Sequence, residues 1–208
     1  MLMKKINNIL EFLDELYPSV GCELNYTKDY ELAIAVMLSA QTTDASVNRV
    51  TPALFSKYST IQSLAEADPD DVMKYINSLG LACNKSRNIV EFAKKLHYEY
   101  NDQLPSDKST LTAFPGIGNK SAGVIRAEVF KIPDLPVDTH ILRISNRLQL
   151  TKSSNPDIVE KDLKNLIEKE RWIKIHHQLI HFGRYFCTAR NPNCQNCKIK
   201  SYCKENKI

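Results

Sequence analysis

The chain has 208 residues and a formal net charge of +4, with 43% apolar and 25% charged residues. This composition is typical of a folded globular protein and excludes a disordered one, and the length allows one domain or two small lobes. No apolar run approaches the roughly 18 residues of a membrane span. The first residues, Met1 to Lys5, lack the apolar core of a secretory signal. We therefore expect a cytoplasmic protein.

The predicted elements are helical from the start of the chain. Apolar residues recur at helical spacing from Ile6 to Leu16, and this first helix is expected to end before Pro18. Asp29 is expected to cap a second helix. The apolar run Leu32–Ala40 predicts that this second helix is buried and central.

Two Asx-Pro pairs mark further helix starts. Asp68-Pro69 and Asn155-Pro156 each place a capping residue before a proline at the first helical position. No sustained alternation of apolar and polar residues indicates a strand. The predicted fold class is therefore all-α.

A helical hairpin is predicted between residues 106 and 130. Ser106 is expected to cap a short helix that runs to about Ala113, and a second helix is expected over Ser121–Phe130. Between them, Gly116 and Gly118 allow backbone angles and close approaches that other residues do not.

The turn of this hairpin has the features of a phosphate site. Free amides at the start of the following helix can bind an anion, and Lys120 follows the glycine pair directly. A plain interhelical turn would use the same glycines. Amides and a lysine that contact phosphate fix the register of a duplex without reading bases, so the turn suits DNA of any sequence.

The C-terminal part is basic. From Arg171 onward, eight Lys and Arg residues stand against one acid, Glu205. Such a local excess of positive charge indicates a polyanion partner, although a merely solvated tail would have the same composition.

Cysteines cluster in the same part of the chain. Four of the six cysteines have the spacing C-x6-C-x2-C-x5-C; they are Cys187, Cys194, Cys197 and Cys203. This spacing predicts a metal site, and the chemistry alone does not choose between zinc and an iron–sulfur cluster. Cys22 and Cys83 have no partner at metal spacing and are expected to be reduced thiols.

The hairpin resembles the helix-hairpin-helix element of the endonuclease III superfamily of DNA glycosylases. The segment Pro136–Arg143 resembles that family's Val-Asp-Thr-His segment, and Leu38–Asp44 resembles its N-terminal DNA-contact segment. The cysteine spacing is similar to that of the family's [4Fe–4S] cluster. These matches run in order over nearly the whole chain.

The resemblance implies a two-lobed helical fold. One lobe, residues 21–132, would end in the helix-hairpin-helix at about 106–130. The other would combine residues 1–20 with 133–208, carry the iron–sulfur loop at 187–203, and leave a DNA cleft between the lobes.

The resemblance also implies the catalytic pair. Lys120 matches the family's nucleophile, which forms a Schiff base with the sugar, and Asp138 matches its catalytic aspartate. A helix N-terminus and partial burial would both disfavour the ammonium form of Lys120. Taken alone, Lys120 can be only a phosphate contact and Asp138 only a helix cap. The lysine favours a bifunctional glycosylase and lyase over the superfamily's adenine glycosylases, which lack it.

Further contacts are expected from the same likeness. Gln41 and Leu81 match the gap-filling positions, and the ordinary alternatives are a helix-end glutamine and a core leucine. The remaining expected DNA contacts are Gly116, Gly118, His140, Arg143, Arg184 and Arg190, with Ser39 and Asp44 in the base pocket.

The implied function is excision of oxidised or ring-saturated pyrimidines, such as thymine glycol, from double-stranded DNA, followed by β-elimination at the abasic site. A monofunctional glycosylase for another lesion and a non-catalytic DNA-binding iron–sulfur protein are the alternatives. We expect a monomer. Phe114, Asn119 and Gly123 depart from the family's usual leucine, arginine and asparagine, and these departures bear on substrate range and DNA affinity.

Overall fold

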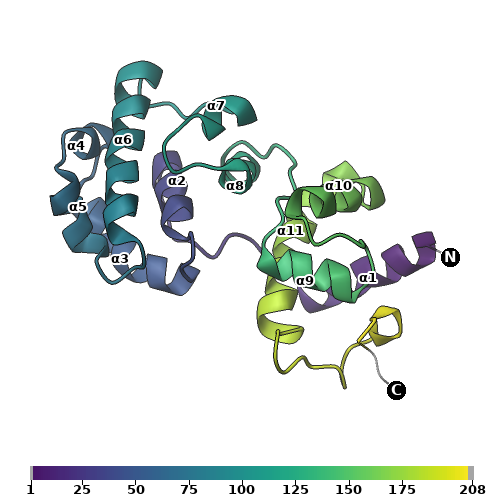
Figure 1. Ribbon diagram of the computed structural model, residues 1–208. Helices are drawn as coiled ribbons and strands as arrows, with labels where there is room; N and C mark the ends of the chain where they lie inside the picture. The colour runs from purple at the N-terminus through teal and green to yellow at the C-terminus, as the bar shows by residue number, and fades with distance from the viewer. Residues whose placement is uncertain (1, 206–208) are drawn as a thin grey trace. The chain divides into compact units, whose positions relative to one another are not determined.

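The computed structural model describes residues 2–205. These residues form helices and connecting turns with no strand among them, so the all-α prediction is confirmed (Figure 1). The α-helices are α1 (Leu2–Leu16), α2 (Asp29–Leu38), α3 (Asp44–Lys57), α4 (Ile61–Ala65), α5 (Pro69–Ile76), α6 (Ala82–Tyr100), α7 (Lys108–Thr112), α8 (Asn119–Val129), α9 (Thr139–Arg147), α10 (Pro156–Leu166) and α11 (Trp172–His181). Shorter turns are the 3-10 helices η1 (Lys169–Arg171) and η3 (Lys200–Tyr202) and the π-helix η2 (Phe182–Phe186). None of the described helices is both long and apolar enough to span a membrane.

The chain divides into two compact units. One is Glu23–Phe130, and the other joins the residues up to Cys22 to those from Lys131 onward. The lobes expected from the sequence have bounds that differ from these by two residues. The assignment of these lobes as the domains of the protein stays a prediction.

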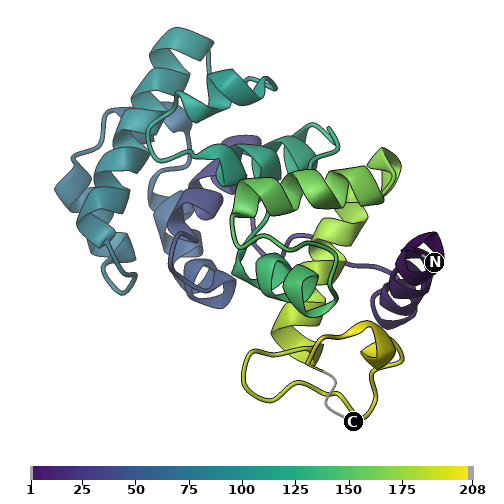
Figure 2. The same ribbon diagram turned by 45° about the vertical axis from the view of Figure 1, so that its right-hand side comes forward.

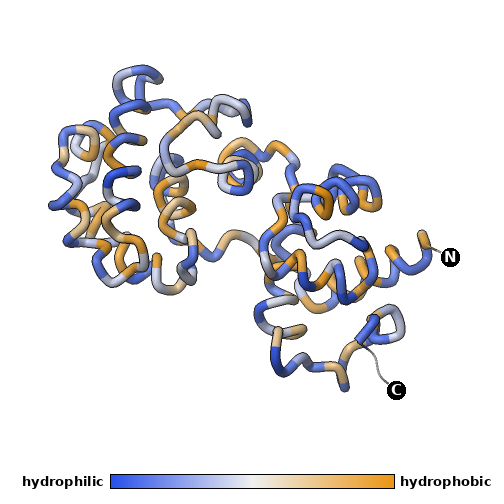
Figure 3. Tube along the Cα trace, viewed as in Figure 1, coloured by the Kyte–Doolittle hydropathy of each residue, from blue (hydrophilic) through white to orange (hydrophobic). Residues whose placement is uncertain are grey.

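In the unit Glu23–Phe130, α2 is the buried helix. Every residue from Glu31 to Leu38 is buried, and Figure 3 shows the hydrophobic residues that recur along this segment. Helices α3, α6 and α8 pack against it. The prediction of a buried central helix is thus confirmed, but the helix ends at Leu38 and Ala40 is exposed.

The start of α2 differs from the prediction. Lys28, not Asp29, occupies the N-cap position, and Asp29 is the first helical residue. The carboxylate of Glu31 accepts hydrogen bonds from the backbone amides of Thr27 at 2.8 Å and Lys28 at 3.1 Å. Because Glu31 satisfies these amides from the third helical position, a capping side chain at position 29 is not needed.

Both Asx-Pro helix starts are confirmed. Asp68 Oδ1 accepts from the amide of Asp70 at 2.8 Å, and Asn155 Oδ1 accepts from the amide of Asp157 at 2.9 Å. The prolines Pro69 and Pro156 are the first residues of α5 and α10.

In the other unit, α1 packs on α11 and the π-helix η2 that continues it. Phe12 makes edge contacts with Phe182 and Phe186, with ring centroids 6.2 and 5.8 Å apart. Buried Gln178 on α11 donates from Nε2 to the carbonyl oxygens of Leu13 at 3.2 Å and Tyr17 at 3.0 Å. A side chain from the far end of the sequence therefore holds the C-terminal turn of α1 and the residue that follows it.

The basic C-terminal part is partly neutralised by α1. Asp14 accepts from Arg171 at 2.7 Å and pairs with Lys174 at 2.6 Å, and Glu15 pairs with Lys198 at 2.5 Å. The excess of positive charge expected in the C-terminal part is therefore smaller, because these three cations already have acidic partners. Lys207 lies outside the described residues. Figures 1 and 2 show the C-terminal loop, in yellow, following η2.

Candidate functional site

The helical hairpin is formed by α7 and α8, and its first cap differs from the prediction. Asp107, not Ser106, is the N-cap of α7, and its Oδ2 accepts from the amide of Thr110 at 2.8 Å. The second helix begins at Asn119, two residues before the expected Ser121. Serine and aspartate cap helices about equally well, so residue type alone did not decide between positions 106 and 107.

The turn between the two helices depends on Gly116. Its φ is +78°, and a Cβ there would lie 2.7 Å from Met37 Cε. Gly118 is different, because its φ is −95° and a Cβ would meet nothing within 4 Å. The conformational requirement predicted for both glycines therefore holds for Gly116 alone. Ile117 between them is buried and anchors the turn.

The N-terminus of α8 is open to an anion. Gly118 is its N-cap, and among residues 2–205 no side chain accepts from the amides of its first turn. Such amides carry the positive end of the helix dipole. Asn119 and Lys120 are both exposed at this end, so the partial burial expected for Lys120 is wrong for the chain without DNA.

Asp138 is the N-cap of α9. Its Oδ1 accepts from the amide of Ile141 at 2.8 Å, and the side chain is half-buried. Within the part of the chain that the structure describes, Oδ2 has no hydrogen-bond partner. One carboxylate oxygen therefore holds the helix, and the other is left for a ligand.

The helix that follows Asp138 is fastened to the π-helix η2. Arg143 Nη2 donates to the carbonyl oxygens of Gly183 at 2.7 Å and Cys187 at 3.2 Å. A Cβ at Gly183 would lie 2.9 Å from Cβ of His140, so only glycine allows this approach. Burial lowers the pKa of the His140 imidazole. Both His140 and Arg143 are expected DNA contacts, and Arg143 has a definite internal role as well.

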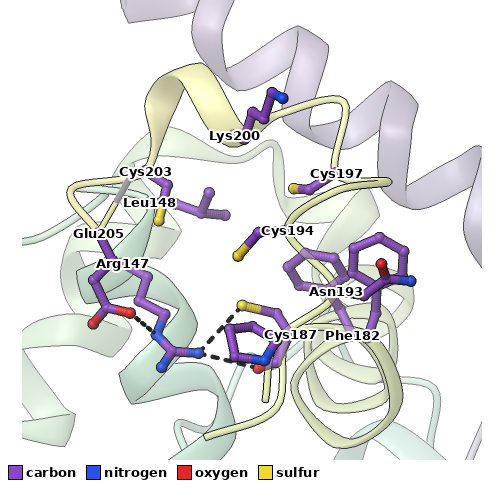
Figure 4. A pocket seen from close by; sticks show the side chains of 12 residues that line it. Arg147, Leu148, Phe182, Cys187, Asn193, Cys194, Cys197, Lys200, Cys203 and Glu205 are labelled. Atoms are coloured by element: carbon purple, nitrogen blue, oxygen red, sulfur yellow. Dashed lines mark hydrogen bonds and ion pairs between the residues drawn. The ribbon is translucent and has the colours of Figure 1, made fainter. Parts of the chain in front are cut away.

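The four cysteines surround one cavity of about 140 Å³. Figure 4 shows the sulfur atoms of Cys187, Cys194, Cys197 and Cys203 turned toward this common space. Among residues 2–205, no three His, Cys, Asp or Glu side chains gather closely enough to hold a single metal ion. Four cysteine thiolates are the usual ligand set of an iron–sulfur cluster, so the residues that line this cavity fit such a cluster.

Arg147 beside this cavity was not expected from the sequence. Only 8% of it is exposed, and Nη1 donates to Sγ of Cys187 at 3.4 Å and to the carbonyl of Thr188 at 2.7 Å. Nη2 donates to Ala189 O at 3.1 Å, and Nε lies 2.7 Å from a carboxylate oxygen of Glu205. Burial raises the pKa of the Cys187 thiol, although Arg147 opposes this. An arginine at the end of a helix carries no signal of such a role in a single sequence.

The two expected gap-filling residues are exposed and have an uncommon backbone. Gln41 has φ +55° and Leu81 has φ +63°, a region that non-glycine residues seldom adopt. Leu81 is 54% exposed, so the alternative of a core leucine is wrong. Gln41 lies in the turn after α2, three residues beyond its last helical residue.

The other expected residues have varied surroundings. Ser39 is the C-cap of α2 and donates to the carbonyl of Val36 at 2.8 Å, while Asp44 is the first residue of α3. Arg184 is half-buried in η2, and Arg190 is exposed in the cysteine loop.

Two family models match the chain. Residues 34–169 match the HhH-GPD superfamily base excision DNA repair protein. This match covers most of the unit Glu23–Phe130 and also α9. Residues 187–203, which hold the four cysteines, match the iron–sulfur binding domain of endonuclease III. Fold and site together therefore define a helix-hairpin-helix protein of base excision DNA repair.

Relatives narrow this class. The chain is 43% identical over 199 residues to the endonuclease III of Rickettsia felis. The aligned residues cover 95% of this chain and 93% of the relative. It superposes on a non-covalent endonuclease III–DNA complex with a TM-score of 0.94 and 39% identity, covering 98% and 95% of the two chains. A trapped endonuclease III–DNA covalent intermediate gives a TM-score of 0.92 at 39% identity, with coverage of 98% and 96%.

The chain belongs to the endonuclease III family. It is a DNA glycosylase and abasic-site lyase of base excision repair, and it carries a [4Fe–4S] cluster.

Proposed function

We propose that the protein removes oxidised or ring-saturated pyrimidines, such as thymine glycol, from double-stranded DNA and then cuts the abasic strand with Lys120 as the nucleophile. The observation that carries this proposal is the exposed Lys120 in the first turn of α8, directly after the Gly116 turn. An amine can form an imine with a sugar, whereas a hydroxyl cannot. The proposed lesion class rests on the family likeness.

In the proposed reaction, the Nζ of neutral Lys120 bonds to C1′ of the damaged nucleotide. The glycosidic bond breaks and its electron pair leaves with the base, which takes up a proton. The sugar ring then opens as O4′ takes a proton from water and leaves C1′ as a hydroxyl, while the nitrogen lone pair forms the protonated imine. Loss of a proton from C2′ expels the 3′ phosphate, and this β-elimination cuts the strand.

We assign Asp138 the carboxylate role in this reaction. Its Oδ2 has no partner among the described residues and is available to stabilise positive charge at the sugar or to accept a proton. Its Oδ1 caps α9, which fixes the direction of the side chain. The two functions use different oxygens, so they are compatible.

The uncapped amides of α8 are the proposed phosphate contact, with Gly116 and Gly118 forming the turn that presents them. Gln41 would hydrogen-bond the base left without a partner, and Leu81 would wedge into the stack beside it. The exposure of both side chains supports this assignment. His140, Arg143, Arg184 and Arg190 are the further proposed DNA contacts, and Ser39 and Asp44 the proposed pocket residues.

We assign the cluster to the thiolates of Cys187, Cys194, Cys197 and Cys203. When bound, the cluster supplies four covalent cross-links within this loop. Around it, Arg147 holds the carbonyls of Thr188 and Ala189, and this fixes the backbone segment that leads to Arg190. We further propose a monomer that acts on the chromosome in the cytoplasm.

Borohydride trapping tests this proposal. Labelled duplex DNA with one thymine glycol is incubated with the wild type, Lys120→Ala and Lys94→Ala, in the presence of borohydride. Lys94 is an exposed lysine of α6 paired with Glu91, so its removal changes the charge equally. We expect an adduct with the wild type and Lys94→Ala, and none with Lys120→Ala.

Two other outcomes would change the proposed function. In the first, the active wild type forms no adduct with the thymine glycol duplex but forms one with an abasic-site duplex. That result would support the lyase activity and reject thymine glycol as the substrate. An active wild type that forms no adduct with either DNA would favour the monofunctional alternative, with Lys120 as a phosphate contact.

A further inference from the structure

Two turns of the unit Glu23–Phe130 carry the proposed gap-filling residues. The turn after α2 carries Gln41, and the turn before α6 carries Leu81. One side-chain hydrogen bond joins these turns, from Nζ of Lys85 to Oγ1 of Thr42 at 2.8 Å. Thr42 is the residue after Gln41, and Lys85 lies one helical turn after Leu81.

The surroundings of Lys85 are uncommon for a lysine. Only 6% of the residue is exposed, and no carboxylate among residues 2–205 pairs with it. Burial lowers the pKa of its ammonium group. Burying an ammonium group beside a neutral hydroxyl costs free energy, and an apolar side chain of the same length would avoid that cost. The fold alone therefore does not explain a lysine at this position.

Both ends of the hydrogen bond are fixed to the backbone of the two turns. The amide of Lys85 donates to the carbonyl of Leu81 at 3.0 Å. On the other side, the amide of Thr42 donates to the carbonyl of Ser39 at 3.1 Å, and the Thr42 hydroxyl donates to the carbonyl of Ala40 at 3.3 Å. A shift of either turn would break or stretch the bond between Lys85 and Thr42.

We propose that Lys85 is a positioning residue that, through Thr42, holds the turns of Gln41 and Leu81 at a fixed separation. This inference rests on the gap-filling role in the proposed function. Gln41 and Leu81 both have positive φ, which costs each about 1 kcal/mol or more unless the surroundings impose it. The part-buried hydrogen bond between their turns is such a constraint. It keeps both side chains ready to enter the stack when the damaged base leaves.

The test compares two duplexes in single-turnover base excision. In one, thymine glycol is paired with adenine; in the other, it faces a tetrahydrofuran residue, so there is no pair to break and no orphaned base to contact. The variants are Lys85→Met and Thr42→Val, which remove the ammonium group and the hydroxyl. Thr42→Ser keeps the hydroxyl, and Lys94→Met removes an exposed positive charge from the same helix.

We expect Lys85→Met and Thr42→Val each to slow excision from the paired duplex about 10-fold, the effect of losing one charge-assisted hydrogen bond. Excision opposite tetrahydrofuran should change less than about 2-fold. The double variant should be no slower than either single one, because both remove the same bond. Thr42→Ser and Lys94→Met should behave like the wild type.

The inference is overturned if the paired duplex is excised at the wild-type rate, or if both duplexes are slowed equally, as a damaged fold would slow them. It is also overturned if only Lys85→Met is slow and its binding depends less on salt, because Lys85 would then be a phosphate contact. If the wild type and Lys94→Met excise neither duplex, the proposed function itself fails and the inference fails with it.

Discussion

The guanidinium of Arg147 donates from Nη1 to the sulfur of Cys187 at 3.4 Å. The same side chain donates to the carbonyls of Thr188 and Ala189. One residue of α9 thus holds both a proposed cluster ligand and the backbone that follows it.

Replacing Arg147 with glutamine should loosen the cysteine loop. Two carbonyls in part-buried hydrogen bonds and one sulfur would lose their charged donor, which destabilises this region by about 1–3 kcal/mol. We expect less iron and sulfide per chain after anaerobic purification and faster bleaching by a chelator. Arg190→Gln, in the same loop but exposed, is the control and should keep the wild-type iron content. Equal iron content and bleaching rates in Arg147→Gln and the wild type would contradict the prediction.

The two glycines of the hairpin turn should respond differently to replacement by alanine. Gly116→Ala should destabilise the protein by about 1–3 kcal/mol, because its φ is +78° and the new Cβ would meet Met37. Gly118→Ala should change stability by less than about 0.5 kcal/mol, since its φ is negative and its surroundings are open. Urea unfolding of both variants measures the difference. Equal midpoints would show that the turn does not require glycine at position 116.

Asp138→Asn should separate capping from catalysis. Asparagine caps a helix about as well as aspartate, so the free energy of unfolding should stay within about 0.5 kcal/mol. Excision should fall by about 10²–10⁴-fold, the range for loss of a catalytic acid–base group. Asp138→Ala should lose the same activity and about 1 kcal/mol of stability besides. If Asp138→Asn keeps wild-type excision, the carboxylate has no catalytic role.

Asp14 should make the packing of α1 on α11 sensitive to acid. Burial opposes its ionisation, but hydrogen bonds from Lys174, Arg171 and Gln178 outweigh burial and hold its pKa well below the usual range. The folded carboxyl is therefore the stronger acid, and its contribution to stability is complete above the unfolded pKa of about 3.9. That contribution is lost as the pH falls from there toward the folded pKa.

Asp14→Asn measures this contribution. At pH 7 it should destabilise the protein by about 1–2 kcal/mol, a value discounted for the exposed third of the side chain. The difference in free energy of unfolding between wild type and variant, measured in urea, should become smaller as the pH falls below about 4. Glu15→Gln, which breaks the exposed pair with Lys198, should cost less than about 0.5 kcal/mol. A difference that stays constant with pH would mean that Asp14 is not held ionised by its partners.

The local patterns of the sequence were sufficient for the helical fold and for a metal site, and the resemblance to the family supplied the candidate catalytic pair. The apolar periodicity of α1 and the Asx-Pro starts of α5 and α10 act within a few residues, so they can be read without the fold. The cysteine spacing similarly predicted a metal site, because the ligands lie in one short loop. The order of the hairpin, Lys120, Asp138 and cysteines was enough to indicate the family.

Only the tertiary structure decided which groups meet across long stretches of chain. Gln178 on Tyr17, Arg147 on Cys187, and Lys85 on Thr42 each join segments tens of residues apart. The same holds for the caps at Lys28 and Asp107, since several nearby polar side chains compete for the same amides. Such contacts depend on which side chains the packing brings within about 3 Å of each other, and spacing along the chain does not contain that information.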